Sequence, residues 1–177
     1  MRPRSPLLLT ALLSACAART PSWPAPIPPV TGKPVTAFAL EQIDARLGTG
    51  AALAARQCIY AHYTGWLTSG VKFDSSRDTM PNGRPRMPIA FAQGARRVIA
   101  GWDAGFEGMR VGGQRRLIIP YQLAYGELGR PPVIPPKATL VFDVELLAVR
   151  DTLPTTPRPG MMAAGPQCAP WADVEGK

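Results

Sequence analysis

The stretch Gly101-Trp102-Asp103-Ala104-Gly105-Phe106-Glu107-Gly108-Met109 decides how this chain folds. Trp102, Phe106 and Met109 are spaced at i, i+4 and i+7, which predicts a short helix with three apolar side chains on one face. A helix of this length is not stable alone in water, so it must pack against another element. The segments on either side of the helix supply that element, because their patterns predict β-strands.

Alternating apolar residues and β-forming residues indicate strands both before and after the helix. The predicted strands span residues 43–47, 57–65, 70–76, 116–119 and 138–149. Within the second strand, Ile59, Ala61 and Tyr63 share one face, so Cys58 and Tyr60 lie on the other. Several strands with one short helix define an α+β fold, in which the helix lies across one face of an antiparallel sheet.

Composition places the globular domain in the middle of the chain. Of the 21 prolines among 177 residues, many gather in two flanking stretches, which leaves residues 37–150 as the folded part and 151–177 as a Pro-rich tail. A domain of this size buries a core without staples. The net charge is +8, but the chain has no basic helix, zinc-ligand spacing or RNA-binding aromatic signature, so we expect no nucleic-acid partner.

The first residues have the layout of an export signal. Arg2 and Arg4 precede a short apolar run and small residues, so residues 1–15 are expected to be a signal peptide. Leu13-Ser14-Ala15-Cys16 resembles a bacterial lipobox, which implies a lipidated Cys16 on the periplasmic side of a Gram-negative membrane. Ala17 at the next position favours the outer membrane, and residues 16–36 would form a Pro-rich spacer. The alternative is a plain secretory signal with an incidental cysteine.

Five stretches occur in the order found in one enzyme family. They are His62-Tyr63-Thr64-Gly65, Phe73-Asp74-Ser75-Ser76, Val98-Ile99-Ala100-Gly101-Trp102, Ala124-Tyr125-Gly126 and residues 134–147. Together they resemble the FKBP-type peptidyl-prolyl cis–trans isomerases, the macrolide-binding immunophilins. The resemblance implies a twisted antiparallel half-barrel wrapped around one short helix, with a ligand pocket between the sheet and the helix.

The resemblance also implies which residues form the site. Tyr63, Asp74, the backbone N–H of Ile99 and the hydroxyl of Tyr125 would act directly on the substrate or orient the groups that do. The substrate-binding pocket would be formed by Phe73, Ile89, Phe91, Val98, Trp102, Val133, Ile134 and Phe142. Ile89 takes a wall position that is commonly aromatic in the family, and Phe91 lies near it.

The chemistry implied by the family is rotation about an X–Pro amide bond. Resonance sets the barrier at roughly 18–20 kcal/mol, and no bond is broken, so no nucleophile, metal or cofactor is expected. We expect Arg77 to pair with Asp74, and we expect His62 to be structural. A monomer that speeds folding of exported, proline-containing client proteins is the predicted function, with macrolides as inhibitors.

Two other functional hypotheses remain open from the sequence. The first is a membrane-anchored chaperone or docking module that holds clients in the same pocket or on the arginine-bearing loop, with little turnover. The second is that Arg77, Arg84, Arg86, Arg96 and Arg97 form a rim that meets anionic lipid headgroups. The alternative to this rim is a set of solvated surface charges.

The remaining cysteines form an even pair. If Cys16 carries a lipid, Cys58 and Cys168 are left in an oxidising compartment, where disulfides persist. A bond between them would tether the Pro- and Gly-rich tail, and Trp171 would give that tail one buried side chain. Two free thiols and an unattached tail are the alternative, because sequence alone does not fix the distance between the two Cα atoms.

Overall fold

The computed structural model describes residues 28, 31–32, 35–37, 39–153 and 165–176. The predicted signal peptide, Cys16, most of the spacer and residues 154–164 of the tail lie outside the described residues. No helix within the described ranges is long and apolar enough to cross a membrane.

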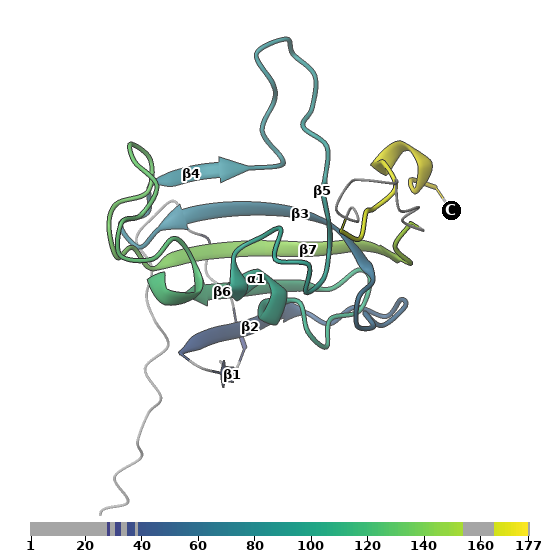
Figure 1. Cartoon of the computed structure of the whole chain (residues 1–177), viewed down its shortest axis with the longest axis horizontal. Helices are drawn as coiled ribbons and strands as arrows, with labels where there is room; N and C mark the ends of the chain where they lie inside the picture. The colour runs from purple at the N-terminus through teal and green to yellow at the C-terminus, as the bar shows by residue number, and fades with distance from the viewer. Residues whose placement is uncertain (1–27, 29–30, 33–34, 38, 154–164, 177) are drawn as a thin grey trace, which may run out of the picture.

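The described chain forms one antiparallel sheet with a short helix laid across one face, which confirms the predicted α+β fold (Figure 1). The strand order is β1-β2-β6-β7-β3-β4, and β5 pairs with β3 beside this path. The elements are β1 (Val35–Ala37), β2 (Leu40–Arg46), β3 (Cys58–Leu67), β4 (Lys72–Ser75), β5 (Ile89–Ala92), α1 (Ala100–Gly105), β6 (Gln114–Ile119), η1 (Tyr121–Leu123), β7 (Leu140–Arg150) and η2 (Trp171–Asp173).

The helix is shorter than predicted. It ends at Gly105, yet Phe106 and Met109 are still buried in the turn that follows it. Two glycines let the helix lie close to β6, because a Cβ at Gly101 would come within 2.3 Å of Ile119 and one at Gly105 within 2.6 Å of Leu117. The close approach explains why the helix holds its position over the sheet despite its length.

The connection between β4 and β5 projects from the domain as a long loop (Figure 1). We call residues 76–88 the finger loop. An isolated bridge between Thr79 and Pro85 pairs its two sides, and the loop carries exposed Met80 and Met87. The finger loop therefore extends from the edge of the sheet between β4 and β5.

Strand β3 has two buried faces, and its residues divide between them as the alternation predicts. Ile59, Ala61 and Tyr63 contribute to the main core around the helix. Cys58 and Tyr60 are fully buried in a second cluster on the opposite face, which we call the outer face. Several strand predictions overran the observed ends. Leu47 lies beyond the end of β2 and is 76% exposed, and the strand predicted at 70–76 spans only Lys72–Ser75.

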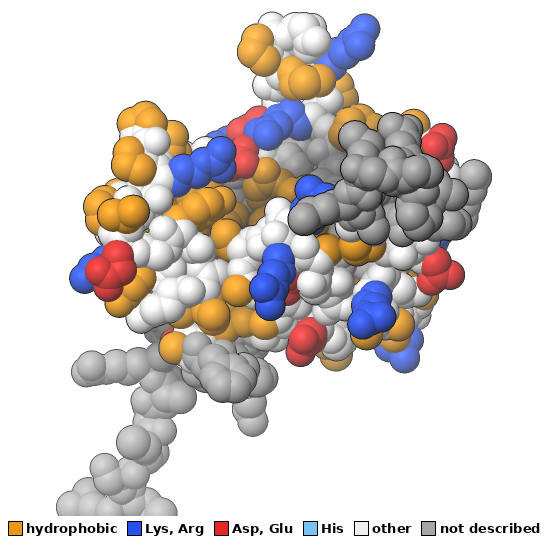
Figure 2. Space-filling model, viewed as in Figure 1, with side chains coloured by type: hydrophobic (Ala, Val, Ile, Leu, Met, Phe, Trp, Pro, Cys, Tyr) orange, Lys and Arg blue, Asp and Glu red, His pale blue; other side chains and the backbone are white. Residues whose placement is uncertain are grey.

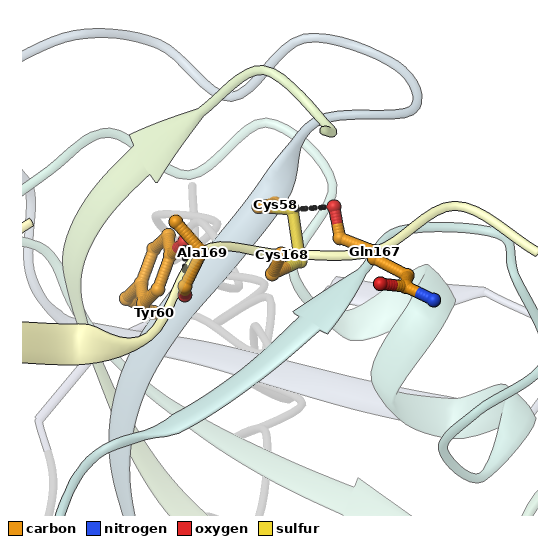
Figure 3. Close-up of a disulfide and its surroundings, with 5 residues drawn as sticks. All are labelled: Cys58, Tyr60, Gln167, Cys168 and Ala169. Atoms are coloured by element: carbon orange, nitrogen blue, oxygen red, sulfur yellow. Dashed lines mark hydrogen bonds between the residues drawn. A yellow bond between two sulfur atoms is a disulfide. The ribbon is translucent and has the colours of Figure 1, made fainter. Parts of the chain in front are cut away.

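The end of the tail lies against the outer face and completes the second cluster. Cys58 and Cys168 form a disulfide with their Cα atoms 5.5 Å apart, and the Tyr60 hydroxyl donates to the carbonyl of Ala169 at 2.8 Å (Figure 3). Val174 is the fully buried tail residue, whereas Trp171 is half-buried with its ring 5.8 Å from that of Tyr60. The disulfide expected from the cysteine pair is thus confirmed, and residues 165–176 are tethered to the domain.

Candidate active site

Trp102 lies at the centre of an aromatic cluster between the helix and the sheet. Its ring centre is 5.0 Å from Tyr63 and 5.2 Å from Phe142, and both rings meet it edge-on. Phe91 lies 5.8 Å from Trp102, and Phe73 meets Phe142 edge-on at 5.5 Å. Edge-to-face contacts stabilise such pairs beyond simple burial. The first turn of α1 therefore places the indole against rings from three strands, β3, β5 and β7.

A polar group lies at one edge of this cluster. The Tyr63 hydroxyl donates to one oxygen of Asp74 at 2.5 Å, and the Arg86 guanidinium donates to the other at 2.6 Å. Arg86 also donates to the Ser75 carbonyl at 2.9 Å, and the Ser75 N–H donates to Asp74 at 3.0 Å. These bonds fix the carboxylate at the start of the finger loop.

The predicted Arg77–Asp74 pair is wrong. Arg77 follows Ser76, whose side chain bonds on the outer face to His62, and Arg77 pairs there with Glu145 on β7. Arg86 instead reaches back from the far side of the finger loop to Asp74. The five arginines therefore do not form one set of unpaired rim cations.

The surroundings lower the pKa of Asp74 and raise the pKa of Tyr63. Burial alone would raise the pKa of Asp74, but the hydrogen bonds from Tyr63 and Arg86 and the Arg86 charge hold it below its ordinary value. Burial raises the pKa of the Tyr63 hydroxyl, and its bond to the Asp74 carboxylate raises it further. Neither group titrates near neutral pH, so the network persists there.

A cavity of about 330 Å³ opens beside this polar group. It is lined by Phe73, Asp74, Tyr125, Arg130, Pro131, Pro132, Val133 and Ile134. Figure 2 shows a hollow of hydrophobic side chains on this face, with Lys and Arg side chains along its upper edge. The cavity is therefore lined by both apolar and polar surface, with Asp74 and Arg130 among its lining residues.

The predicted site residues fall into two groups. Phe73, Asp74, Tyr125, Val133 and Ile134 line the cavity itself. The remainder, Tyr63, Ile89, Phe91, Val98, Ile99, Trp102 and Phe142, belong to the main core or pack against it. The cavity is also lined by Arg130, Pro131 and Pro132, which no sequence motif pointed to, although they directly precede the predicted pocket residues Val133 and Ile134.

Two N–H groups at the site lack partners among the described residues. Trp102 is 4% exposed, and its indole Nε1 is the buried side-chain nitrogen without a hydrogen-bond partner. The backbone N–H of Ile99, the residue before α1, also donates to no described residue, while its carbonyl accepts from Trp102. Buried polar groups are almost always satisfied, so the Trp102 indole N–H calls for a functional explanation.

His62, the one histidine of the chain, lies on the outer face. Its Nδ1 lies 2.9 Å from the Ser76 hydroxyl, and burial together with the nearby Arg77 lowers the pKa of the imidazole. The described residues contain no group of three His, Cys, Asp or Glu side chains placed to hold a metal ion.

A twisted antiparallel sheet crossed by one helix, with an aromatic cavity edged by a single carboxylate, defines a class of peptide-bond isomerases. Residues 50–147 match the family model for FKBP-type peptidyl-prolyl cis-trans isomerases, so the chain belongs to this family and is an enzyme of this type. The matched residues include every cavity-lining side chain and exclude the docked tail.

Individual relatives agree with this assignment. An FK506-binding protein of Neisseria meningitidis is 48% identical over 106 residues, covering 60% of this chain and 92% of the relative. The human peptidyl-prolyl cis-trans isomerase FKBP2 is 50% identical over 91 residues, covering 51% and 60%. The crystal structure of Escherichia coli FkpA aligns with a TM-score of 0.57 at 37% identity, covering 67% of this chain and 52% of that chain. That of AtFKBP13 gives 0.55 at 37% identity, covering 62% and 92%.

Proposed function

We propose that the cavity beside Tyr125 binds the proline ring of an X–Pro segment and that the predicted residues divide the work of isomerisation. The observation that carries this proposal is a cavity lined by Phe73, Tyr125 and Ile134 beside the main core, against which Ile99 packs with its N–H unpartnered among the described residues. The Ile99 N–H and the Tyr125 hydroxyl hold the carbonyls that flank the rotating bond. Trp102 forms the floor, and the Tyr63–Asp74–Arg86 network fixes the wall.

The site accelerates rotation by stabilising the twisted amide. A planar amide carries more charge on its oxygen than the twisted form, because twisting removes resonance. An apolar cavity that replaces water therefore favours the twisted amide relative to the planar one. Hydrogen bonds that hold only the flanking groups leave the central bond free to turn. Binding of the twisted amide in preference to the planar one raises the rate of rotation.

An assay of a short Xaa–Pro peptide tests this function. The folded protein should accelerate cis–trans isomerisation, and Tyr125→Phe should lower kcat with little loss of stability because only a hydroxyl is removed. A macrolide of the FK506 type should compete with the peptide, since several relatives are named FK506-binding proteins. A folded protein that accelerates no peptide would refute the proposal, and full activity in Tyr125→Phe would refute the role of that hydroxyl.

We also propose that the enzyme works outside the cytoplasm, attached by lipid at Cys16 to the outer membrane of a Gram-negative cell. The Cys58–Cys168 disulfide supports an oxidising compartment. Residues 1–15 supply the export signal, and the clients would be proline-containing envelope proteins. Mass spectrometry of the mature N-terminal peptide should find an acylated Cys16, whereas an unmodified terminus at another residue would refute the anchor.

A second candidate function is client holding by the finger loop. Met80 is 36% and Met87 52% exposed, and Met is a side chain that adapts to varied apolar partners. Met80→Ser/Met87→Ser should leave peptide turnover unchanged and weaken suppression of aggregation of an unfolded protein. Equal suppression by the variant and the parent would refute this function.

A further inference from the structure

Two charged side chains, Asp74 and Arg130, line the cavity, and only Asp74 has an ionic partner among the described residues. Asp74 is neutralised by Arg86, and Lys137 lies 3.4 Å from Glu127 on the loop that follows Tyr125. Arg130 also lines the cavity, but it makes no ion pair with any described carboxylate. The cavity therefore carries a positive charge that the described protein does not balance.

The position of Arg130 is well defined. Its backbone N–H donates to the Ile134 carbonyl at 2.8 Å, and its own carbonyl accepts from Ile134 at 2.9 Å and from Val133 at 3.2 Å. Its guanidinium carbon lies 6.0 Å from the ring centre of Tyr125, within the range of a cation–π contact. The charge is thus held over the ring whose hydroxyl is assigned to a flanking carbonyl of the substrate.

We propose that Arg130 is a specificity-determining residue, which favours client segments with Asp or Glu immediately next to the proline. The inference rests on the proposed function, because it takes the cavity as the proline site. A residue beside the proline, held near Tyr125, brings its side chain to the margin where Arg130 lies. The negative charge of Asp74 does not oppose an acidic substrate, since Arg86 already neutralises it.

Pairs of peptides that differ only in charge measure this preference. One pair carries Glu or Gln before the proline, and a second pair carries Glu or Gln after it. In at least one pair, kcat/KM for Glu should exceed that for Gln by about two- to fivefold at low salt, the range of a solvent-exposed ion pair. The ratio should shrink towards one at about 0.5 M salt, because salt screens exposed charges.

Variants of two neighbouring cations separate a local role from a general charge effect. In the folded protein, Arg130→Gln should bring the Glu/Gln ratio of kcat/KM to about one, and Arg130→Lys should keep most of the preference. Lys137→Gln is the matched control, because Lys137 lies on the same loop, is already paired and does not line the cavity. It should leave the ratio unchanged.

The possible failures are distinguishable. If the wild-type protein is active but its ratio is one in both pairs, or if Arg130→Gln keeps the wild-type ratio, this inference is wrong and the proposed site stands. If Lys137→Gln removes the preference as strongly as Arg130→Gln, net charge rather than Arg130 is responsible, and the inference is wrong again. If the folded protein accelerates none of the peptides, the proposed function fails and the inference fails with it.

Discussion

Two tyrosines on the same strand, Tyr60 and Tyr63, face opposite sides of the sheet and have different partners. Tyr63 meets Trp102 edge-on and donates to the Asp74 side chain, inside the segment that matches the isomerase family. Tyr60 packs against Trp171 and donates to a backbone carbonyl of the tail, which lies outside that segment. One face of β3 therefore carries the site, and the other carries an element added to the family domain.

The difference indicates that stability and catalysis are separable in this protein. The outer-face cluster contains Cys58, Tyr60, Ala92, Ala148 and Val174, none of which lines the cavity. Changes there should alter the free energy of unfolding and leave turnover intact, whereas changes around Tyr125 should do the reverse.

Removal of the disulfide should have the largest effect on stability. The bond closes a loop with a sequence separation of 110 residues, and the chain-entropy model gives an upper value of about 4–5 kcal/mol for such a loop. Cys58→Ser/Cys168→Ser should lower the free energy of unfolding by up to that amount, measured by urea denaturation. The kcat/KM of the folded variant should stay within about twofold of the parent.

A truncated domain gives the matched test of the tail. Residues 37–150 with Cys58→Ser lack the disulfide and all tail contacts, and the fragment contains every proposed site residue. It should be less stable than the double serine variant, because Tyr60 loses its cover, yet still active. A folded fragment without activity would show that the tail belongs to the site.

Phe73→Ala should have the largest effect on the pocket face. Truncation of a fully buried Phe to Ala costs about 3–5 kcal/mol in the free energy of unfolding. Phe73 is half-buried, so Phe73→Ala should cost less than this. Its ring lines the cavity, so kcat/KM should fall about tenfold or more, which corresponds to ~1.4 kcal/mol of lost binding. Unchanged kcat/KM would mean that the cavity is not the proline site.

Two Tyr→Phe variants, one on each face of β3, compare the effect of removing a single hydroxyl on stability and on kcat/KM. Tyr60→Phe should cost about 1 kcal/mol of stability, the value of a typical buried hydrogen bond, with no change in kcat/KM. Tyr63→Phe frees one oxygen of Asp74 and should lower kcat/KM several-fold at a similar cost in stability. Equal effects of both variants on activity would contradict the separation of the two faces.

The pH dependence should also differ between the two faces, with the smallest effects. On the pocket face, the pKa of Asp74 is lowered from 3.8 and that of Tyr63 is raised from 10.0. Their stabilising contributions are therefore present between these values and are lost as pH falls below 3.8 or rises above 10. Peptide turnover should accordingly be flat from about pH 5 to 9.

On the outer face, the folded state lowers the pKa of His62 below 6.5, so the unfolded chain takes up the proton first. Stability should therefore decrease slightly as pH falls through 6.5, and His62→Gln should remove this dependence. A drop in turnover at the same pH that His62→Gln also removes would contradict a structural role for the histidine.

The sequence predicted most of the fold because its signals are local. The spacing of Trp102, Phe106 and Met109 located the helix, and alternation along 57–65 assigned the two faces of β3. The prediction overran the helix end, since close packing of Gly105 on Leu117 is a tertiary contact that local spacing does not report.

The site was less predictable where a long loop determines which charges meet. Arg77 and Arg86 lie in the same finger loop, and only the path of that loop decides which of them reaches Asp74. The same holds for Arg130, whose place beside Tyr125 depends on backbone bonds to Ile134. The docked tail had two signals, an even cysteine pair and Trp171, while the burial of Val174 had none.

The indole N–H groups of Trp102 and Trp171 report on the two faces in a single experiment. Trp102 is the floor of the proposed site and its Nε1 has no described partner, whereas Trp171 lies in the tail against Tyr60. In a ¹H–¹⁵N spectrum assigned with Trp→Phe variants, titration with an Xaa–Pro peptide should move the Trp102 indole signal and leave that of Trp171 in place. A peptide that is turned over yet shifts Trp171 and not Trp102 would contradict the assignment of the site to the helix-bearing face.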